Sequence, residues 1–184
     1  MRPRTGWLLA GVSAPESVAA HSYATALLAL LLADAINAGW AGQGLTRPLD
    51  SERVLRIALL HDLTESLLTD LPKRSAELLG REAKREAEAR AAQQIFATVP
   101  DGAAYAELWA EYASGATPEA QVVRDADKLE MVHQALRYEA RGQQNLDEFW
   151  AQPQWYFAAS ASLYQRLSAG RSPSQEKGLA HADA

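Results

Sequence analysis

The fold of this chain is decided by the stretch Val54-Leu55-Arg56-Ile57-Ala58-Leu59-Leu60-His61-Asp62. Its apolar residues favour a buried helix, which Asp50 or Ser51 can cap at its start. We expect this helix to continue straight into His61 and Asp62 and to end before Leu71-Pro72. Adjacent side chains leave a helix axis about 100° apart, so His61 and Asp62 could hold an ion between them.

A second apolar helix is expected earlier in the chain. The run Ser13-Ala14-Pro15-Glu16 is typical of a helix start, because Ser can cap, Pro suits the first turn and Glu completes a capping box. The helix then continues to about Asn37, and His21 lies within it. Its apolar residues cover more than one face, as in a helix at the centre of a domain: Leu27, Leu28, Leu30, Leu31, Leu32 and Ile36.

The remaining segments also favour helices. Residues 75–99 are rich in Ala, Glu, Lys and Arg, with opposite charges at i,i+4 spacing, which predicts a third, partly solvated helix. Further helices are expected over residues 101–112 and 118–141, and one or two over residues 147–167. No segment shows the alternation of a strand, so the sequence predicts an all-α bundle of about six or seven helices.

The composition is typical of one globular domain. The 184 residues are 48% hydrophobic and 22% charged, so we expect a single domain over residues 1–169 and a flexible tail over residues 170–184. A net charge of −5 without a basic run argues against a nucleic-acid polymer as partner. The chain starts without the pattern of a signal peptide, and the longest aliphatic run, residues 24–33, is too short to span a membrane. We therefore expect a cytoplasmic protein with no membrane partner.

Strong metal ligands must come from nitrogen and oxygen, because the chain contains no cysteine. His21 and Asp127 both lie in helical stretches and are interpreted as inward-facing polar residues, like His61 and Asp62. Glu65 stands four residues after His61, so on one helix it would share the same face and could act as general acid or base. Two imidazoles and two carboxylates suit a divalent ion such as Mn, Co, Fe, Zn or Mg.

Three blocks of sequence carry a more specific signal. They are Arg4-Thr5-Gly6-Trp7 with Pro15-Glu16-Ser17-Val18-Ala19-Ala20-His21-Ser22, Ala58-Leu59-Leu60-His61-Asp62-Leu63-Thr64-Glu65 with Thr69-Asp70-Leu71-Pro72, and Asp125-Ala126-Asp127-Lys128-Leu129-Glu130-Met131. Together they resemble the HD superfamily of metal phosphohydrolases, and within it the 5′-deoxynucleotidase branch that includes the HD-domain-containing protein 2 group. The resemblance covers about residues 4–138 and implies the HD-domain helical bundle.

The resemblance also implies roles for single residues. The metal ligands would be His21, His61, Asp62 and Asp127. Glu65 and Asp70 match the acidic residues that such enzymes use around the attacking water. Arg4 and Trp7 match a pair that holds the phosphate or sugar, with the ring where a ribose 2′-hydroxyl would otherwise sit. Ala20 and Thr64 depart from the pattern of many relatives, but neither removes a ligand.

The function that the resemblance implies is that of an enzyme, a metal-dependent phosphomonoesterase that hydrolyses (deoxy)nucleoside 5′-monophosphates to nucleoside and phosphate. The metal would activate a water and bind a phosphate oxygen for in-line attack, while Glu65 manages protons. Asp70 could orient the water or protonate the leaving group. Related enzymes imply a homodimer. Two alternatives stay open: an HD-type phosphohydrolase acting on a pyrophosphate, cyclic or signalling nucleotide, or a nucleotide-binding regulator whose chemistry has lapsed.

Several of these residues also have a purely structural interpretation. Asp70 could be a turn residue, and Arg4 and Trp7 could anchor the N-terminus to the core. Glu130 could hydrogen-bond a ligand histidine or pair with a cation. His133 is expected at the surface or in packing. The aromatic residues near the C-terminus are expected in the core or in a dimer interface: Trp150, Trp155, Tyr156 and Phe157.

Overall fold

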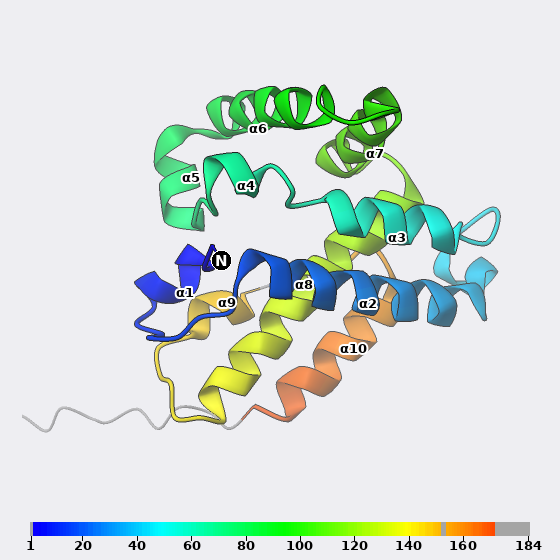
Figure 1. Ribbon diagram of the computed structural model, residues 1–184. Coiled ribbons are helices and arrows are strands. Elements are labelled where there is room, and N and C mark those ends of the chain that lie inside the picture. The colour runs from blue at the N-terminus through cyan, green and yellow to red at the C-terminus, as the bar shows by residue number, and fades with distance from the viewer. Residues whose placement is uncertain (1, 152–153, 172–184) are drawn as a thin grey trace, which may run out of the picture.

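The computed structural model describes residues 2–151 and 154–171, and its fold is all-α, as the sequence predicts (Figure 1). Within these residues the only extended pairing is an isolated bridge between Pro3 and Ser17. The tail expected over residues 170–184 lies, from residue 172 onward, outside the described residues. The single domain expected over residues 1–169 stays a prediction.

Long helices make up most of the structure. Among the described residues, six have ten residues or more: α2 (Val18–Asn37), α3 (Ser51–Leu60), α6 (Arg81–Phe96), α7 (Gly102–Ser114), α8 (Pro118–Glu139) and α10 (Ala158–Ala169). The shorter elements are α1 (Thr5–Leu9), the 3₁₀ turn η1 (Trp40–Gln43), α4 (Glu65–Leu68), α5 (Lys73–Leu79) and α9 (Asp147–Trp150). These short elements account for the excess over the six or seven helices expected.

The centre of the structure is formed by α2, α3 and α8, which pack against one another. In Figure 1, α8 passes behind α2 with α10 beside it, and α4 to α7 form a layer above them. The core contacts include Ala29 and Ile36 from α2, Ile57 from α3, and Val122 and Leu129 from α8, all fully buried. Burial of these apolar faces, more than helix propensity, holds the three helices together.

The start of α2 differs from the prediction. The helix begins at Val18, where the Ser17 hydroxyl accepts the Ala20 N–H at 3.1 Å. The residues expected to open the helix instead pair with the N-terminal segment, because the Arg4 N–H donates to the Glu16 carbonyl and the Val18 N–H donates to the Arg2 carbonyl, each at 2.9 Å. The capping box predicted from Ser13 to Glu16 is therefore wrong.

The apolar residues of α2 form two distinct faces. One face is buried and carries His21, while Tyr23, Leu27 and Leu31 are 70%, 48% and 57% exposed on the other. The prediction of burial on several faces is thus wrong for this stripe. Within the described part of the chain, α2 alone is long and apolar enough to cross a membrane, a composition that core helices share. Its packing against α3 and α8 is that of a core helix.

The helix that leads into His61 and Asp62 also stops earlier than expected. Asp50 caps α3 by accepting the Arg53 N–H at 3.0 Å, but α3 ends at Leu60 and residues 61–64 form turns. The Leu63 N–H donates to the Leu60 carbonyl at 3.1 Å, a bond that spans only three residues. Glu65 therefore lies on the separate helix α4, and its helical spacing from His61 is not the reason for its position.

Gly80 divides the predicted third helix into α5 and α6. Its φ of +85° lies in a region that favours glycine, because a side chain would be strained there. On α6 the pairs Lys84–Glu88 and Glu86–Arg90 lie at 3.4 and 3.2 Å, which confirms the expected i,i+4 ion pairs on a partly solvated helix.

Candidate metal centre

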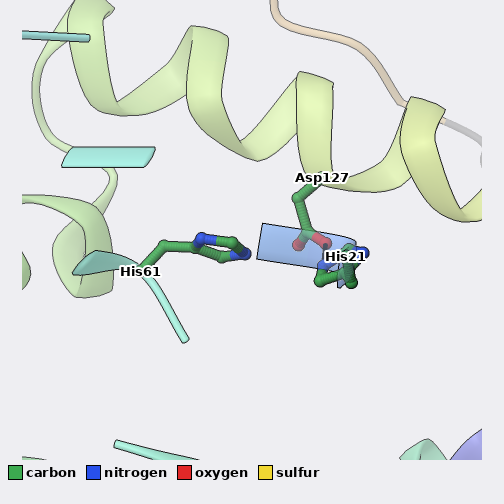
Figure 2. Close-up of side chains that lie close together, drawn as sticks. All are labelled: His21, His61 and Asp127. Atoms are coloured by element: carbon green, nitrogen blue, oxygen red, sulfur yellow. Dashed lines mark ion pairs between the residues drawn. The ribbon is translucent and has the colours of Figure 1, made fainter. Parts of the chain in front are cut away.

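The four predicted metal ligands meet at the junction of α2, α3 and α8. His21 Nε2 lies 3.1 Å from Asp127 Oδ1 and 3.4 Å from Asp62 Oδ2, and His61 Nε2 lies 3.2 Å from Asp62 Oδ2. Figure 2 shows the rings of His21 and His61 and the carboxylate of Asp127 close together. One ligand atom from each of these three residues lies within 4.8 Å of the others.

Both imidazoles are oriented by their second nitrogen. His21 Nδ1 lies 2.5 Å from Glu130 Oε2, and His61 Nδ1 lies 2.7 Å from the Ala58 carbonyl oxygen, so each Nδ1 can donate a proton. The Nε2 atoms of His21 and His61 are buried and have no hydrogen-bond partner among the described residues. Such an arrangement leaves two Nε2 lone pairs for a metal ion, and it is how ligand histidines are usually held.

The electrostatics of the centre favour a bound cation. Burial lowers the pKa of His21, but the neighbouring carboxylates of Asp127, Asp62 and Glu130 raise it well above the usual value. Burial opposes ionisation of Asp127, yet His21 brings its pKa down to about 2. The pKa of Asp62 also falls well below its usual range, against the effect of burial, because His61 and His21 lie beside it. The two carboxylates thus stay ionised, and the donor set fits a divalent ion.

Arg4 and Glu65 border the centre. Arg4 Nη1 lies 3.2 Å from Asp62 Oδ2, which joins the N-terminal segment to a predicted metal ligand. Burial, together with the charges of Asp62 and Asp70, raises the pKa of Glu65 to about 8. One Glu65 carboxylate oxygen is buried without a hydrogen-bond partner among the described residues. A carboxyl group of this kind can exchange a proton near neutral pH, although its catalytic role stays a prediction.

Asp70 contacts the start of α1. Its Oδ2 accepts the Thr5 N–H at 2.5 Å and the Thr5 hydroxyl at 3.0 Å. Its charge also affects the pKa values of Arg4 and Glu65, so it lies near the centre. The structure thus gives Asp70 a structural contact, while its catalytic role stays a prediction.

Trp7 anchors the N-terminal segment to the core. Its side chain is 1% exposed, stacks on Phe149 with ring centroids 4.0 Å apart, and meets the edge of Tyr138 at 5.1 Å. Trp7 Nε1 donates to Glu16 Oε1 at 3.1 Å. These contacts confirm the anchoring interpretation. Contact between Trp7 and a substrate sugar stays a prediction.

The structure also decides between the interpretations of several other residues. Glu130 contacts His21, a predicted ligand, which agrees with the hydrogen-bonding interpretation. His133 is exposed, as expected. Trp150 and Phe157 are buried, which confirms a core position for these two, whereas Tyr156 is 46% exposed.

Sequence reasoning missed Tyr112, which touches two predicted ligands. Its hydroxyl donates to Asp127 Oδ2 at 3.1 Å, and its ring meets His61 edge-on with centroids 5.2 Å apart. Tyr112 lies near the end of α7, in a segment with no motif spacing to any ligand. Only the packing of α7 against α3 and α8 brings it to the centre, so no local pattern could have revealed it.

Sequence comparison identifies the family. The HD domain family matches residues 1–162, so the chain belongs to this family. Among similar proteins, the 5′-deoxynucleotidase hdd1 of Schizosaccharomyces pombe is 35% identical over 158 residues, which are 81% of this chain and 73% of that protein. The 5′-deoxynucleotidase HDDC2 of Homo sapiens is 34% identical over 139 residues, 74% of this chain and 61% of that protein. The chain thus spans less than two thirds of the human relative.

Solved structures agree with this assignment. The PH0347 protein from Pyrococcus horikoshii OT3 has a TM-score of 0.76 and 35% identity, with 92% of each chain covered. A protein from Magnetospirillum magnetotacticum MS-1, described as a predicted metal-dependent phosphohydrolase, has a TM-score of 0.64 and 25% identity. The match covers 92% of this chain and 82% of that one.

Proposed function

We propose that this protein is a metal-dependent phosphohydrolase that releases phosphate from nucleoside 5′-monophosphates, with a preference for deoxyribonucleotides. The observation that carries the proposal is the pair of buried Nε2 atoms of His21 and His61, which face the carboxylates of Asp62 and Asp127. The similarity to 5′-deoxynucleotidases of yeast and human supports the choice of substrate.

Each residue around the centre has a different role in this proposal. A bound divalent ion would lower the pKa of a water and neutralise phosphate charge. His21, His61, Asp62 and Asp127 would hold that ion. Arg4, whose guanidinium already lies against Asp62, would add positive charge beside the phosphate. Trp7 would limit the space for the sugar. Because its side chain is buried, it would do so by fixing the position of the residues that cover it.

Glu65 is the proposed proton carrier. Its raised pKa, about 8, allows it to take a proton from the attacking water and to return one to the 5′-oxygen that leaves. The unpartnered carboxylate oxygen would be the atom that holds the proton. The sequence also places Asp70 beside the water, but its Oδ2 already accepts the Thr5 N–H, so we assign proton transfer to Glu65 alone.

The experiment that tests this function is phosphate release from deoxyribo- and ribonucleoside 5′-monophosphates by metal-stripped protein resupplied separately with Mn, Co, Mg, Zn or Fe. Turnover confined to deoxyribonucleotides is the expected result. Activity only on pyrophosphate, cyclic or signalling nucleotides would support the same metal centre with a different substrate. Metal binding without turnover of any phosphate ester would contradict the proposal and favour a nucleotide-binding regulator.

Finer properties are part of the same proposal. We propose a homodimer, because Tyr23, Leu27 and Leu31 form an exposed, uncharged stripe on α2 that could pair with its own copy. Light scattering should show a dimer that Leu27→Lys converts to a monomer. We also propose a cytoplasmic protein without nucleic-acid or membrane partners, in line with a small nucleotide substrate. Recovery of the native protein with membranes, or its retention on DNA or RNA, would contradict this.

A further inference from the structure

The N-terminus of the first helix, α1, is capped by a residue that is distant in the sequence. Arg4 is the residue before α1, and its side chain makes no capping bond to the helix. The Asp70 carboxylate takes that place, because Oδ2 accepts the Thr5 N–H at 2.5 Å and lies 3.4 Å from the Gly6 nitrogen. The Thr5 hydroxyl lies 2.7 Å from the Asp70 carbonyl oxygen and 3.0 Å from Asp70 Oδ2, and its single hydrogen can be donated to either. Exposed first-turn N–H groups are what an Asp or Asn cap normally satisfies.

The backbone before Asp70 is unusual in a way that fits this contact. Thr69 has a φ of +68°. A β-branched residue rarely adopts a positive φ, and such a conformation persists only where surrounding contacts enforce it. The four contacts between Asp70 and the start of α1 supply that enforcement directly after Thr69.

The contacts between Asp70 and the start of α1 fix the position of Arg4. Arg4 immediately precedes Thr5, its N–H donates to the Glu16 carbonyl at 2.9 Å, and its Nη1 lies 3.2 Å from Asp62. The Asp70 contacts and the hydrogen bond to Glu16 thus hold the backbone on both sides of Arg4. Without Asp70, α1 would lose the acceptor for its first N–H groups, and Arg4 would lose one of its two supports.

We propose that Asp70 is a positioning residue that caps α1 and thereby holds the Arg4 guanidinium over the metal centre, where it binds the phosphate. This assignment replaces proton transfer by Asp70, and it rests on the proposed function for the identity of the phosphate group. Oδ2 already faces three donors from Thr5 and Gly6, which leaves that oxygen little capacity for a water.

The test uses the difference between Asn and Ala at position 70. Asn keeps an acceptor oxygen and caps helices about as well as Asp, whereas Ala keeps none. Neither residue can donate a carboxylic proton. The variants are Asp70→Asn, Asp70→Ala, Arg4→Gln and Arg4→Gln with Asp70→Ala, with Glu77→Ala on α5 as a control for an exposed carboxylate nearby. The readouts are inorganic phosphate affinity by calorimetry on metal-loaded protein, and KM and kcat for the best nucleotide.

The expected result is a graded and coupled loss. Asp70→Ala should weaken phosphate binding about tenfold and raise KM similarly, the size expected when a cap is lost. Asp70→Asn should stay within about threefold of the unmodified protein. In the Arg4→Gln background, Asp70→Ala should have almost no further effect, because its influence passes through Arg4.

Two results would overturn the assignment. One is an equal, large fall in kcat for Asp70→Asn and Asp70→Ala with phosphate affinity unchanged. The other is a full additional loss from Asp70→Ala when Arg4 is already Gln. If Asp70→Ala does not fold, as judged by thermal unfolding, Thr5→Ala serves in its place and should show a smaller loss of the same kind. Phosphate binding separates this inference from the proposed function, because it can be measured even if no nucleotide is hydrolysed.

Discussion

The proposed metal ligands and the proposed substrate-side residues are held in different ways. His21 and Asp127 lie within helices of 20 and 22 residues, and His61 and Asp62 follow a ten-residue helix that packs against both. Arg4 and Glu65, by contrast, lie at the ends of helices of five and four residues. The ligand half depends on packing of a core, and the substrate half depends on a few side-chain bonds between distant segments.

This difference predicts how each half responds to change. The Arg4–Asp62 and Thr5–Asp70 contacts join residues 58 and 65 positions apart in the chain, and short helices have little stability of their own. Loss of a ligand should abolish metal binding, because the core cannot rearrange to supply another donor. Loss of a substrate-side residue should leave the metal in place and change kcat or KM.

The largest expected effect comes from the ligand half. His61→Ala should lose metal and lower phosphate release by about a thousandfold or more, because a ligand that the core presents cannot be replaced. Metal content of the purified variant and turnover are the measurements. His133→Ala, an exposed histidine on α8, is the matched control and should bind metal normally. Retention of metal and activity by His61→Ala would remove His61 from the centre.

Glu65→Gln should separate the two halves. We expect kcat to fall about a hundredfold or more with metal content unchanged, since Gln keeps the size but cannot carry the proton. Glu77→Gln provides the control on a neighbouring helix. If Glu65→Gln lost the metal instead, Glu65 would be a ligand, and if turnover were unaffected, the proton role would be wrong.

Glu130→Gln tests the support beneath the ligand half. The charged contact at 2.5 Å orients His21, so this change should weaken metal affinity about tenfold to a hundredfold. Titration with Co²⁺, followed by its visible spectrum, measures the affinity without relying on turnover. An unchanged Co²⁺ affinity would show that the helix packing alone orients His21.

The pH dependence of stability tests the environment of Glu65. In metal-free protein its pKa rises from 4.5 to about 8, mainly through burial and then through Asp62 and Asp70. A raised pKa stabilises the folded state below the unfolded pKa, and this contribution is lost as the pH rises through about 8. Glu65→Gln should therefore gain stability relative to the unmodified protein as the pH rises from 5 to 8, by at most about 5 kcal/mol. Chemical unfolding at several pH values would measure it, and a difference that does not change with pH would contradict the assigned environment.

The smallest effect is expected from Tyr112→Phe. This change removes only the hydroxyl that donates to Asp127 and keeps the ring against His61, so metal affinity should fall about threefold to tenfold. Tyr105→Phe, on the same helix but with an exposed side chain, is the control. Equal affinities for both variants would show that Asp127 needs no support from Tyr112.

The sequence predicted the parts of the structure that local patterns determine. The all-α fold follows from the helical patterns of the sequence, and the meeting of His21, His61, Asp62 and Asp127 follows from the resemblance to HD phosphohydrolases. The start of α2 was predicted wrongly, because residues 2–4 pair with residues 16–18 in an extended conformation and the expected capping box does not form. The contact of Tyr112 depends on the packing of α7, which no spacing rule describes.

The claim that four residues hold a metal on which phosphate release depends is tested most directly by one titration. Metal-stripped protein would receive Co²⁺ in steps while bound metal and phosphate release from a deoxyribonucleoside 5′-monophosphate are followed together. We predict no turnover without metal and a rise that tracks the binding of metal to the centre, with both signals absent in Asp127→Ala. Full turnover by the metal-stripped protein, or metal binding and turnover that persist in Asp127→Ala, would contradict the account.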